Sequence, residues 1–155
     1  MSEDQPDGGF RGPVVCKIVG ITYRQLDYWA RTGLLAPSLS AETHGSGSRR
    51  LYSYQDIVRL RVIKQLLDAG LSLQQTRKAI DCLEGTLGED LASANLVMAE
   101  GGVVLAETQE AVFDILRGGQ GVFNVLPLSG VVEQVDAAIH QLPPTEGGTA
   151  GIAAV

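Results

Sequence analysis

Cationic, aromatic and amide side chains gather in two short stretches of the chain, residues 22–31 and residues 49–52. An arginine can donate two parallel hydrogen bonds to a guanine edge or to a phosphate, and a glutamine can bond an adenine edge in the same way. Hydroxyl and indole groups can donate to phosphate oxygens. Together these residue types predict a surface that contacts double-stranded DNA. The candidate contact residues are Thr22, Tyr23, Arg24, Gln25, Tyr28, Trp29, Arg31, Arg49, Arg50 and Tyr52.

Arg24 and Gln25 lie near the start of a predicted helix. A helix in the major groove reads base edges with its N-terminal residues, so these two side chains are the favoured base readers. Gln25 has a competing role, because its spacing from Thr22 is that of a helix-capping pair. We therefore expect Arg24 to be the main base-reading residue.

The remaining aromatic and basic candidates have other predicted roles. Tyr28 or Trp29 can donate a hydrogen bond to a phosphate, but at least one of the two is expected to lie in the core. Arg49 and Arg50 come at the end of a polar loop, where they can neutralise phosphates. The alternative is that they are solvated charges of that loop.

Two short helices separated by a glycine are predicted to position these residues. The first begins near Pro13, which a first helical turn tolerates, and ends at Gly20, which can take a left-handed conformation. The second begins with a capping box at Thr22 and ends at Gly33. This arrangement is typical of a helix-turn-helix motif.

A wing and two longer helices are predicted to follow. Residues 36–50 lack a periodic apolar face and are expected to form an exposed loop, and a short strand at residues 51–52 closes the wing. Ser53 caps the next helix, whose apolar residues recur at spacings of three and four, and Ser72 caps the last helix of this region.

The second half of the chain changes its hydrophobic period and predicts a small ββαβα unit. Gly101 and Gly102 separate its first two apolar runs, which is a hairpin signal. The fold class is therefore α+β, with an N-terminal winged helix-turn-helix followed by this unit. The expected elements are strands at 96–100 and 103–107, a helix at 108–117, a strand at 122–128 and a helix that begins at Ser129.

The final predicted helix carries a wide apolar stripe, which we interpret as a dimer contact. A small sheet with two helices needs only part of that stripe for its own core. The alternative is that the whole stripe packs inside a single ββαβα unit. The stripe consists of Val132, Val135, Ile139 and Leu142.

The net charge of −6 conceals an asymmetry between the two halves of the chain. Residues 10–84 contain eleven Lys and Arg against six Asp and Glu, whereas residues 85–155 contain one against nine. This distribution predicts a DNA-binding module joined to a partner or sensor module. The expected organisation is a disordered tail at 1–10, a DNA-binding domain at 11–84, a dimerisation or effector domain at 85–143 and a flexible tail at 144–155.

Other function classes find little support in the sequence. Two cysteines and two histidines are too few for a disulfide framework or a zinc site, and Cys16 and Cys82 are interpreted as core residues. The glycine-rich stretch 118–121 lacks the Lys-Ser/Thr of a phosphate loop. No apolar run reaches the ~20 residues of a membrane span, and no signal peptide is visible. We expect a cytoplasmic protein with no enzymatic activity, cofactor, metal or membrane partner.

Four motifs of the first half occur together. They are Thr22-x-Arg24-x-Leu26-x-Tyr28-aromatic, Gly33-Leu34-Leu35-x-Pro37, Arg50-Leu51-Tyr52-Ser53-x-x-Asp56 and Gly70-Leu71-Ser72-Leu73. These motifs resemble the winged-helix DNA-binding domain of MerR-family transcriptional regulators. The resemblance implies that Arg24 and Tyr28 contact DNA from the recognition helix and Arg50 from the wing.

The sequence also departs from the usual family pattern. Asp27 stands where the family has a basic residue, Ala30 where it has an acid, and Trp29 where it has a second tyrosine. Asp27 is therefore expected to face away from the DNA backbone. Glycines at 85 and 88 leave no room for the family's long dimerisation helix, and the cysteines of metal-sensing members have no counterparts. The whole chain resembles a small actinobacterial subgroup with a compact α/β tail.

Two functions are compatible with these features. The first is a sequence-specific transcriptional regulator, a homodimer on an inverted-repeat promoter operator at the nucleoid, with RNA polymerase as a further candidate partner. A single module of this size contacts too few base pairs for useful specificity, so we expect a dimer that reads two half-sites. The alternative is an adaptor whose acidic α/β domain binds another protein and uses DNA as a scaffold. The regulator gives a bounded, roughly palindromic footprint, and the adaptor a diffuse one.

Overall fold

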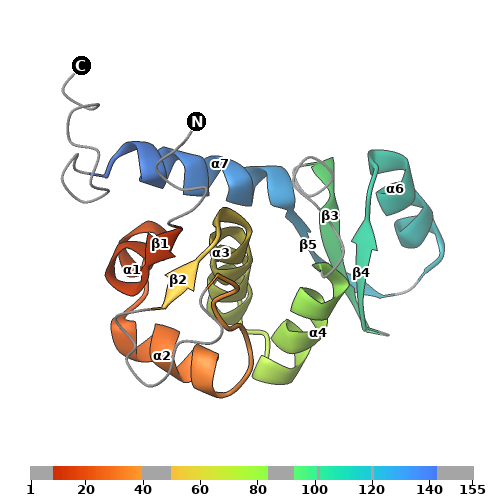
Figure 1. Ribbon diagram of the computed structural model, residues 1–155. Coiled ribbons are helices and arrows are strands. Elements are labelled where there is room, and N and C mark those ends of the chain that lie inside the picture. The colour runs from red at the N-terminus through yellow and green to blue at the C-terminus, as the bar shows by residue number, and fades with distance from the viewer. Residues whose placement is uncertain (1–8, 40–49, 84–92, 101, 120, 143–155) are drawn as a thin grey trace. The chain divides into compact units, whose positions relative to one another are not determined.

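The computed structural model describes residues 9–39, 50–83, 93–100, 102–119 and 121–142 (Figure 1). The chain divides into two compact units. Unit 1 comprises residues 1–61 and 134–155, and unit 2 comprises residues 62–133. The division falls within two helices, α3 (Tyr54–Asp68) and α7 (Leu128–His140), whereas the expected boundary at 84–85 lies outside the described residues.

Unit 1 contains the predicted pair of short helices, α1 (Gly12–Val19) and α2 (Tyr23–Arg31). Pro13 stands in the first turn of α1. Gly20 ends this helix with φ of 85°, a left-handed conformation that glycine adopts without steric cost, and its N–H donates to the carbonyl of Cys16. The helix-turn-helix prediction is confirmed in both helices.

A two-stranded antiparallel ribbon accompanies these helices. Strand β1 (Phe10–Arg11) pairs with β2 (Leu51–Tyr52), and Phe10 lies opposite Tyr52. The strand at 51–52 was predicted, but the expectation that the disordered tail extends through residue 10 is wrong for Phe10. A two-residue strand carries no alternation that a sequence pattern can reveal, so pairing with β2 decides its conformation. Residues 1–8 and 40–49 lie outside the described part of the chain.

The first half of α3 and the end of α7 complete unit 1. Arg61 on α3 donates to the backbone carbonyl of Val19 at 2.8 Å and to Oε1 of Gln134 on α7 at 3.0 and 3.2 Å. The Tyr54 hydroxyl donates to the Asp136 carboxylate. These bonds tie α1, α3 and the C-terminal half of α7 into one body.

Unit 2 has the predicted ββαβα order after one preceding helix, α4 (Leu73–Leu83). Strands β3 (Asn95–Ala99), β4 (Gly102–Ala106) and β5 (Val122–Pro127) form an antiparallel sheet in the order β4-β3-β5. Helix α6 (Gln109–Arg117) connects β4 to β5, and α7 follows β5. The α+β fold class is confirmed.

The central strand β3 is buried along its whole length. Val97 packs in a cluster with Ala106 of β4 and Val112 of α6. The neighbouring residue Met98 lines a small hollow together with Leu71, which precedes α4. Successive side chains of a strand point to opposite faces of the sheet. Helix α6 therefore covers the face to which Val97 points, and α4 covers the face to which Met98 points.

The apolar stripe predicted on the final helix is only partly accessible. Val135 is fully buried within the chain, and Val132, Ile139 and Leu142 are half-buried. Leu128 and Val131 are buried as well. The buried side of α7 therefore runs through Leu128, Val131 and Val135 and not through the predicted stripe. Val135 therefore serves the core, and it is not available for a contact with a second copy.

Candidate nucleic-acid interface

The exposed face of α2 carries the arginines and tyrosine that the sequence singled out. Arg24, Tyr28 and Arg31 follow one another at spacings of four and three, which places them on one side of a helix. Tyr28 is 54% exposed and the Arg31 side chain 72% exposed. Among the described residues, none forms a hydrogen bond or ion pair with the Arg24 side chain. The guanidinium of Arg24 is therefore available to a ligand.

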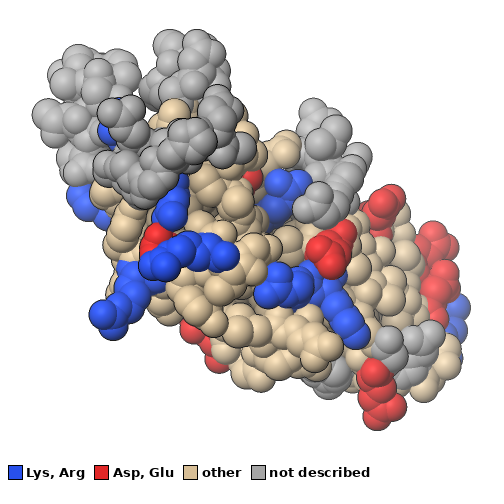
Figure 2. Space-filling view, turned by 60° about the horizontal axis from the view of Figure 1, so that its bottom comes forward, with Lys and Arg blue, Asp and Glu red and all other residues tan. Residues whose placement is uncertain are grey.

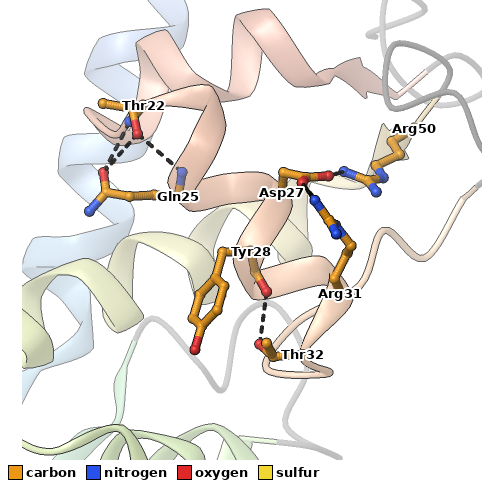
Figure 3. Close-up of polar contacts among 7 residues, drawn as sticks. All are labelled: Thr22, Gln25, Asp27, Tyr28, Arg31, Thr32 and Arg50. Atoms are coloured by element: carbon orange, nitrogen blue, oxygen red, sulfur yellow. Dashed lines mark hydrogen bonds and ion pairs between the residues drawn. The ribbon is translucent and has the colours of Figure 1, made fainter.

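The capping box of α2 fixes the start of this face. The Gln25 N–H donates to Oγ1 of Thr22, and the Thr22 N–H donates to Oε1 of Gln25, both at 3.1 Å (Figure 3). The carbonyl of the Gln25 side chain is therefore occupied, while its amide nitrogen points away from this bond. This geometry supports Arg24 over Gln25 as the base-reading residue.

Two predicted contact residues lie in the core of unit 1. Trp29 is 4% exposed, on the side of α2 that also buries Leu26, so it is the core member of the Tyr28 and Trp29 pair. Tyr52 is fully buried, and burial raises its pKa to about 12. On the ribbon, Tyr52 lies opposite Phe10. The predicted roles of Trp29 and Tyr52 at the DNA surface are therefore wrong.

Asp27 joins the wing to the helix (Figure 3). Its Oδ2 accepts hydrogen bonds from Nε and Nη2 of Arg31 at 2.9 and 2.7 Å, and its Oδ1 accepts one from Nη1 of Arg50 at 2.7 Å. The hydrogen bonds from Arg31 and then Arg50 hold the pKa of Asp27 below its ordinary value. The spacing of four between Asp27 and Arg31 is a readable signal for an ion pair, but the link to Arg50 crosses 23 residues and leaves no local pattern.

A buried carboxylate fixes the segment that follows α2. Oδ2 of Asp56 accepts hydrogen bonds from the backbone N–H and hydroxyl of Ser38 and from the N–H of Ser53, at 2.7 to 2.9 Å. Ser53 in turn accepts from the N–H of Asp56 at 3.0 Å. The predicted cap at Ser53 is thus present. The role of Ser38 was not predicted, because a serine in a polar loop has no distinguishing pattern.

Basic side chains dominate this part of unit 1. Residues 9–39 and 50–61 contain seven Lys and Arg against two Asp. Figure 2 shows Lys and Arg side chains on the face of the molecule turned toward the viewer. Such a surface attracts a polyanion by releasing its counterions. Arg49 lies outside the described residues.

Metal ligands do not cluster in the described part of the chain. No three His, Cys, Asp or Glu among them lie close enough together to hold a metal ion. Cys16 and Cys82 are free and half-buried, and burial raises the pKa of both thiols, which disfavours the reactive thiolate. No described helix is long and apolar enough to cross a bilayer.

The helices, the ribbon and the basic face coincide with a family match. Residues 11–82 match the family described as MerR HTH family regulatory protein. These residues are a MerR-type helix-turn-helix domain. Within this MerR-type domain, Arg24 and Tyr28 lie on the exposed face of the second helix, and Arg50 lies beside the ribbon strand β2.

Relatives of known sequence extend the similarity beyond the MerR-type domain. The chain is 47% identical over 131 residues to an HTH-type transcriptional regulator of Mycobacterium tuberculosis, covering 84% of this chain and 57% of the relative. It is 31% identical over 67 residues to the HTH-type transcriptional regulator GlnR of Bacillus cereus, covering 43% and 48%. Nodulation protein NolA of a Bradyrhizobium species is 39% identical over 62 residues, covering 40% and 24%.

The chain thus spans little more than half the length of the mycobacterial relative. An alignment of 131 residues is longer than the MerR-type domain, so part of the ββαβα region is shared as well.

Proposed function

We propose that this protein is a transcriptional regulator that binds specific double-stranded DNA through the exposed face of α2 and the basic residues of unit 1. The observation that carries the proposal is the set of Arg24, Tyr28 and Arg31 on one solvent-facing side of a capped helix in a MerR-type domain. Arg24 is assigned to base edges in the major groove. Tyr28 and Arg31 are assigned to phosphates.

The proposed active species is a homodimer on an inverted-repeat operator. One domain of this size reads few base pairs, and pairing two half-sites raises affinity and specificity together. Binding at promoters places the protein at the nucleoid in the cytoplasm and makes RNA polymerase a candidate partner. The half-buried residues Val132, Ile139 and Leu142 remain the proposed contribution of α7 to the dimer contact.

Selection from a random double-stranded DNA library tests the proposal. The purified chain is expected to enrich one roughly palindromic motif and to protect a bounded footprint on it. Failure to enrich any motif would contradict specific binding. Diffuse protection that is the same on unrelated sequences would instead favour the adaptor. In that alternative the acidic ββαβα unit binds a protein and DNA serves as a scaffold.

Arg24→Ala sharpens the test on the selected operator. The variant is expected to lose ~1–3 kcal/mol of discrimination at one base pair of each half-site, because a bidentate contact is removed. The control is Arg117→Ala, which removes an exposed arginine from α6 in unit 2. Equal operator-to-scrambled affinity ratios for Arg24→Ala and the wild type would show that Arg24 is not the base reader.

A further inference from the structure

Asp27 is an acidic side chain in the middle of the surface that is assigned to phosphates. A carboxylate within a few ångströms of a phosphate repels it, so an acid is an unfavourable residue at this place. It is nevertheless held as the ionised form, since its arginine partners keep its pKa below the ordinary value. The charge of Asp27 therefore does not by itself explain why an acid occupies this position.

The two carboxylate oxygens of Asp27 have separate partners. Oδ2 receives both hydrogen bonds of Arg31, four residues further along the same helix, and Oδ1 receives the bond from Arg50 next to strand β2 (Figure 3). The Asp27 and Arg50 side chains are 23% and 18% exposed, whereas Arg31 is 72% exposed. The bond to Arg50 is the least exposed part of the group, and it links two elements distant in sequence.

Arg50 retains the capacity to bind a phosphate while it is held by Asp27. A guanidinium has five N–H donors and stays charged, and the bond to Asp27 uses only the Nη1 end. An arginine that is already fixed loses less conformational freedom on binding than one that is free in solution. The three side chains together keep one net positive charge.

We propose that Asp27 is a positioning residue, which holds Arg50 of the wing at a fixed distance from the base-reading face of α2. This inference rests on the proposed DNA binding. Its consequence is that the wing and the recognition helix meet the duplex in one register, so that the phosphate contact of Arg50 forms only when Arg24 faces the correct base pair.

The sign of the effect of Asp27→Ala distinguishes positioning from simple repulsion. If Asp27 acts only through its charge, its removal strengthens binding to every DNA sequence. If it positions Arg50, the ratio of operator affinity to scrambled-DNA affinity falls by about 3- to 10-fold, the cost of leaving one arginine to be ordered on binding. Both affinities are measured by fluorescence anisotropy with the selected operator and a scrambled duplex.

A double-mutant cycle identifies the partner through which Asp27 acts. In the Arg50→Ala background, Asp27→Ala is expected to cause no further loss of operator preference. The matched control is Asp68→Ala, which removes an exposed aspartate paired with Lys64 at 2.6 Å on α3 and should leave the preference unchanged. Additive losses in the double variant would overturn the proposal.

Arg50→Lys gives a second route if Asp27→Ala folds poorly by circular dichroism. Lysine keeps the charge but not the planar donor group, so the variant is expected to lose operator preference while retaining affinity for scrambled DNA. An unchanged preference in Arg50→Lys, or a gain of operator affinity in Asp27→Ala, would refute positioning while leaving DNA binding intact. A wild-type chain that selects no motif would refute the proposed function itself.

Discussion

Units 1 and 2 differ in charge. The described part of unit 1 contains seven Lys and Arg against three Asp and Glu, and that of unit 2 contains four against seven. In unit 1, hydrogen-bonded polar groups such as Asp56 connect the loops and helices. In unit 2, the five residues of β3 are all buried. Both units bury apolar residues, and unit 1 adds a network of hydrogen-bonded polar groups beside its basic surface.

The exposed aromatic residues follow the same division. Unit 1 exposes Tyr23 and Tyr28, each with a hydroxyl that suits a wet surface, and unit 2 exposes Phe113 of α6, which has no polar atom. A tyrosine can remain solvated and still donate to a phosphate. The exposed residues of unit 1 are therefore compatible with a ligand that is itself hydrated.

The largest expected effect on stability is in unit 2. Leu96→Ala on β3 is expected to lower the free energy of unfolding by about 2–5 kcal/mol, because it leaves a cavity at a fully buried position. Val104→Ala on β4, where the side chain is 41% exposed, serves as the control and should cost far less. Urea denaturation followed by circular dichroism measures both. Equal losses would show that burial in β3 does not dominate the stability of unit 2.

Most elements of the fold could be predicted because their signals are local. The capping boxes at Thr22 and Ser72, with Gln25 and Gln75, have the expected reciprocal hydrogen bonds. The ββαβα order followed from short apolar runs separated by glycines. Both ends of each strand, and the start of the final helix, lie within one residue of the prediction. Gly20 ends α1 in the left-handed conformation, as predicted.

The errors arose where pairing over long distances decides the outcome. Phe10 is a strand residue because Tyr52 lies opposite it, and no pattern within residues 1–11 indicates that partner. Tyr52 was expected at the DNA surface, but it is fully buried on the strand that pairs with β1. The same holds for Asp27, whose bond to Arg50 spans 23 residues. Hydrophobic periodicity shows which residues share one face of a helix or strand, but it does not show which distant residues pack against that face.

Tyr52 and Tyr54 offer a comparison within unit 1. The Tyr52 hydroxyl is buried with no hydrogen-bond partner among the described residues, whereas the Tyr54 hydroxyl donates to Asp136. Tyr52→Phe is expected to raise the free energy of unfolding by about 1 kcal/mol, and Tyr54→Phe to lower it by a similar amount. Operator affinity should stay unchanged in Tyr52→Phe. A destabilised Tyr52→Phe would reveal a partner for its hydroxyl.

The smallest expected effect is the pH dependence of the Asp27 link. The pKa of Asp27 in the folded chain is lowered, first by Arg31 and then by Arg50, so the unfolded chain binds the proton more tightly. The stabilisation is therefore fully present above the unfolded value of about 4, and it is lost as pH falls through the lower folded pKa. The difference in melting temperature between wild type and Asp27→Ala should be constant at about pH 5 to 8 and change only below about pH 4.

Because the difference in helix propensity between Asp and Ala does not titrate, only the change of this gap with pH reports the ion pairs. Added salt should reduce the part of the gap that depends on the exposed Arg31 more than the part that depends on Arg50, whose side chain is 18% exposed. The change of the gap with pH should therefore persist in part at high salt in the wild type and vanish at high salt in the Arg50→Ala background. A gap that is equally large at low pH would mean that the Asp27 carboxylate does not hold the wing in the folded chain.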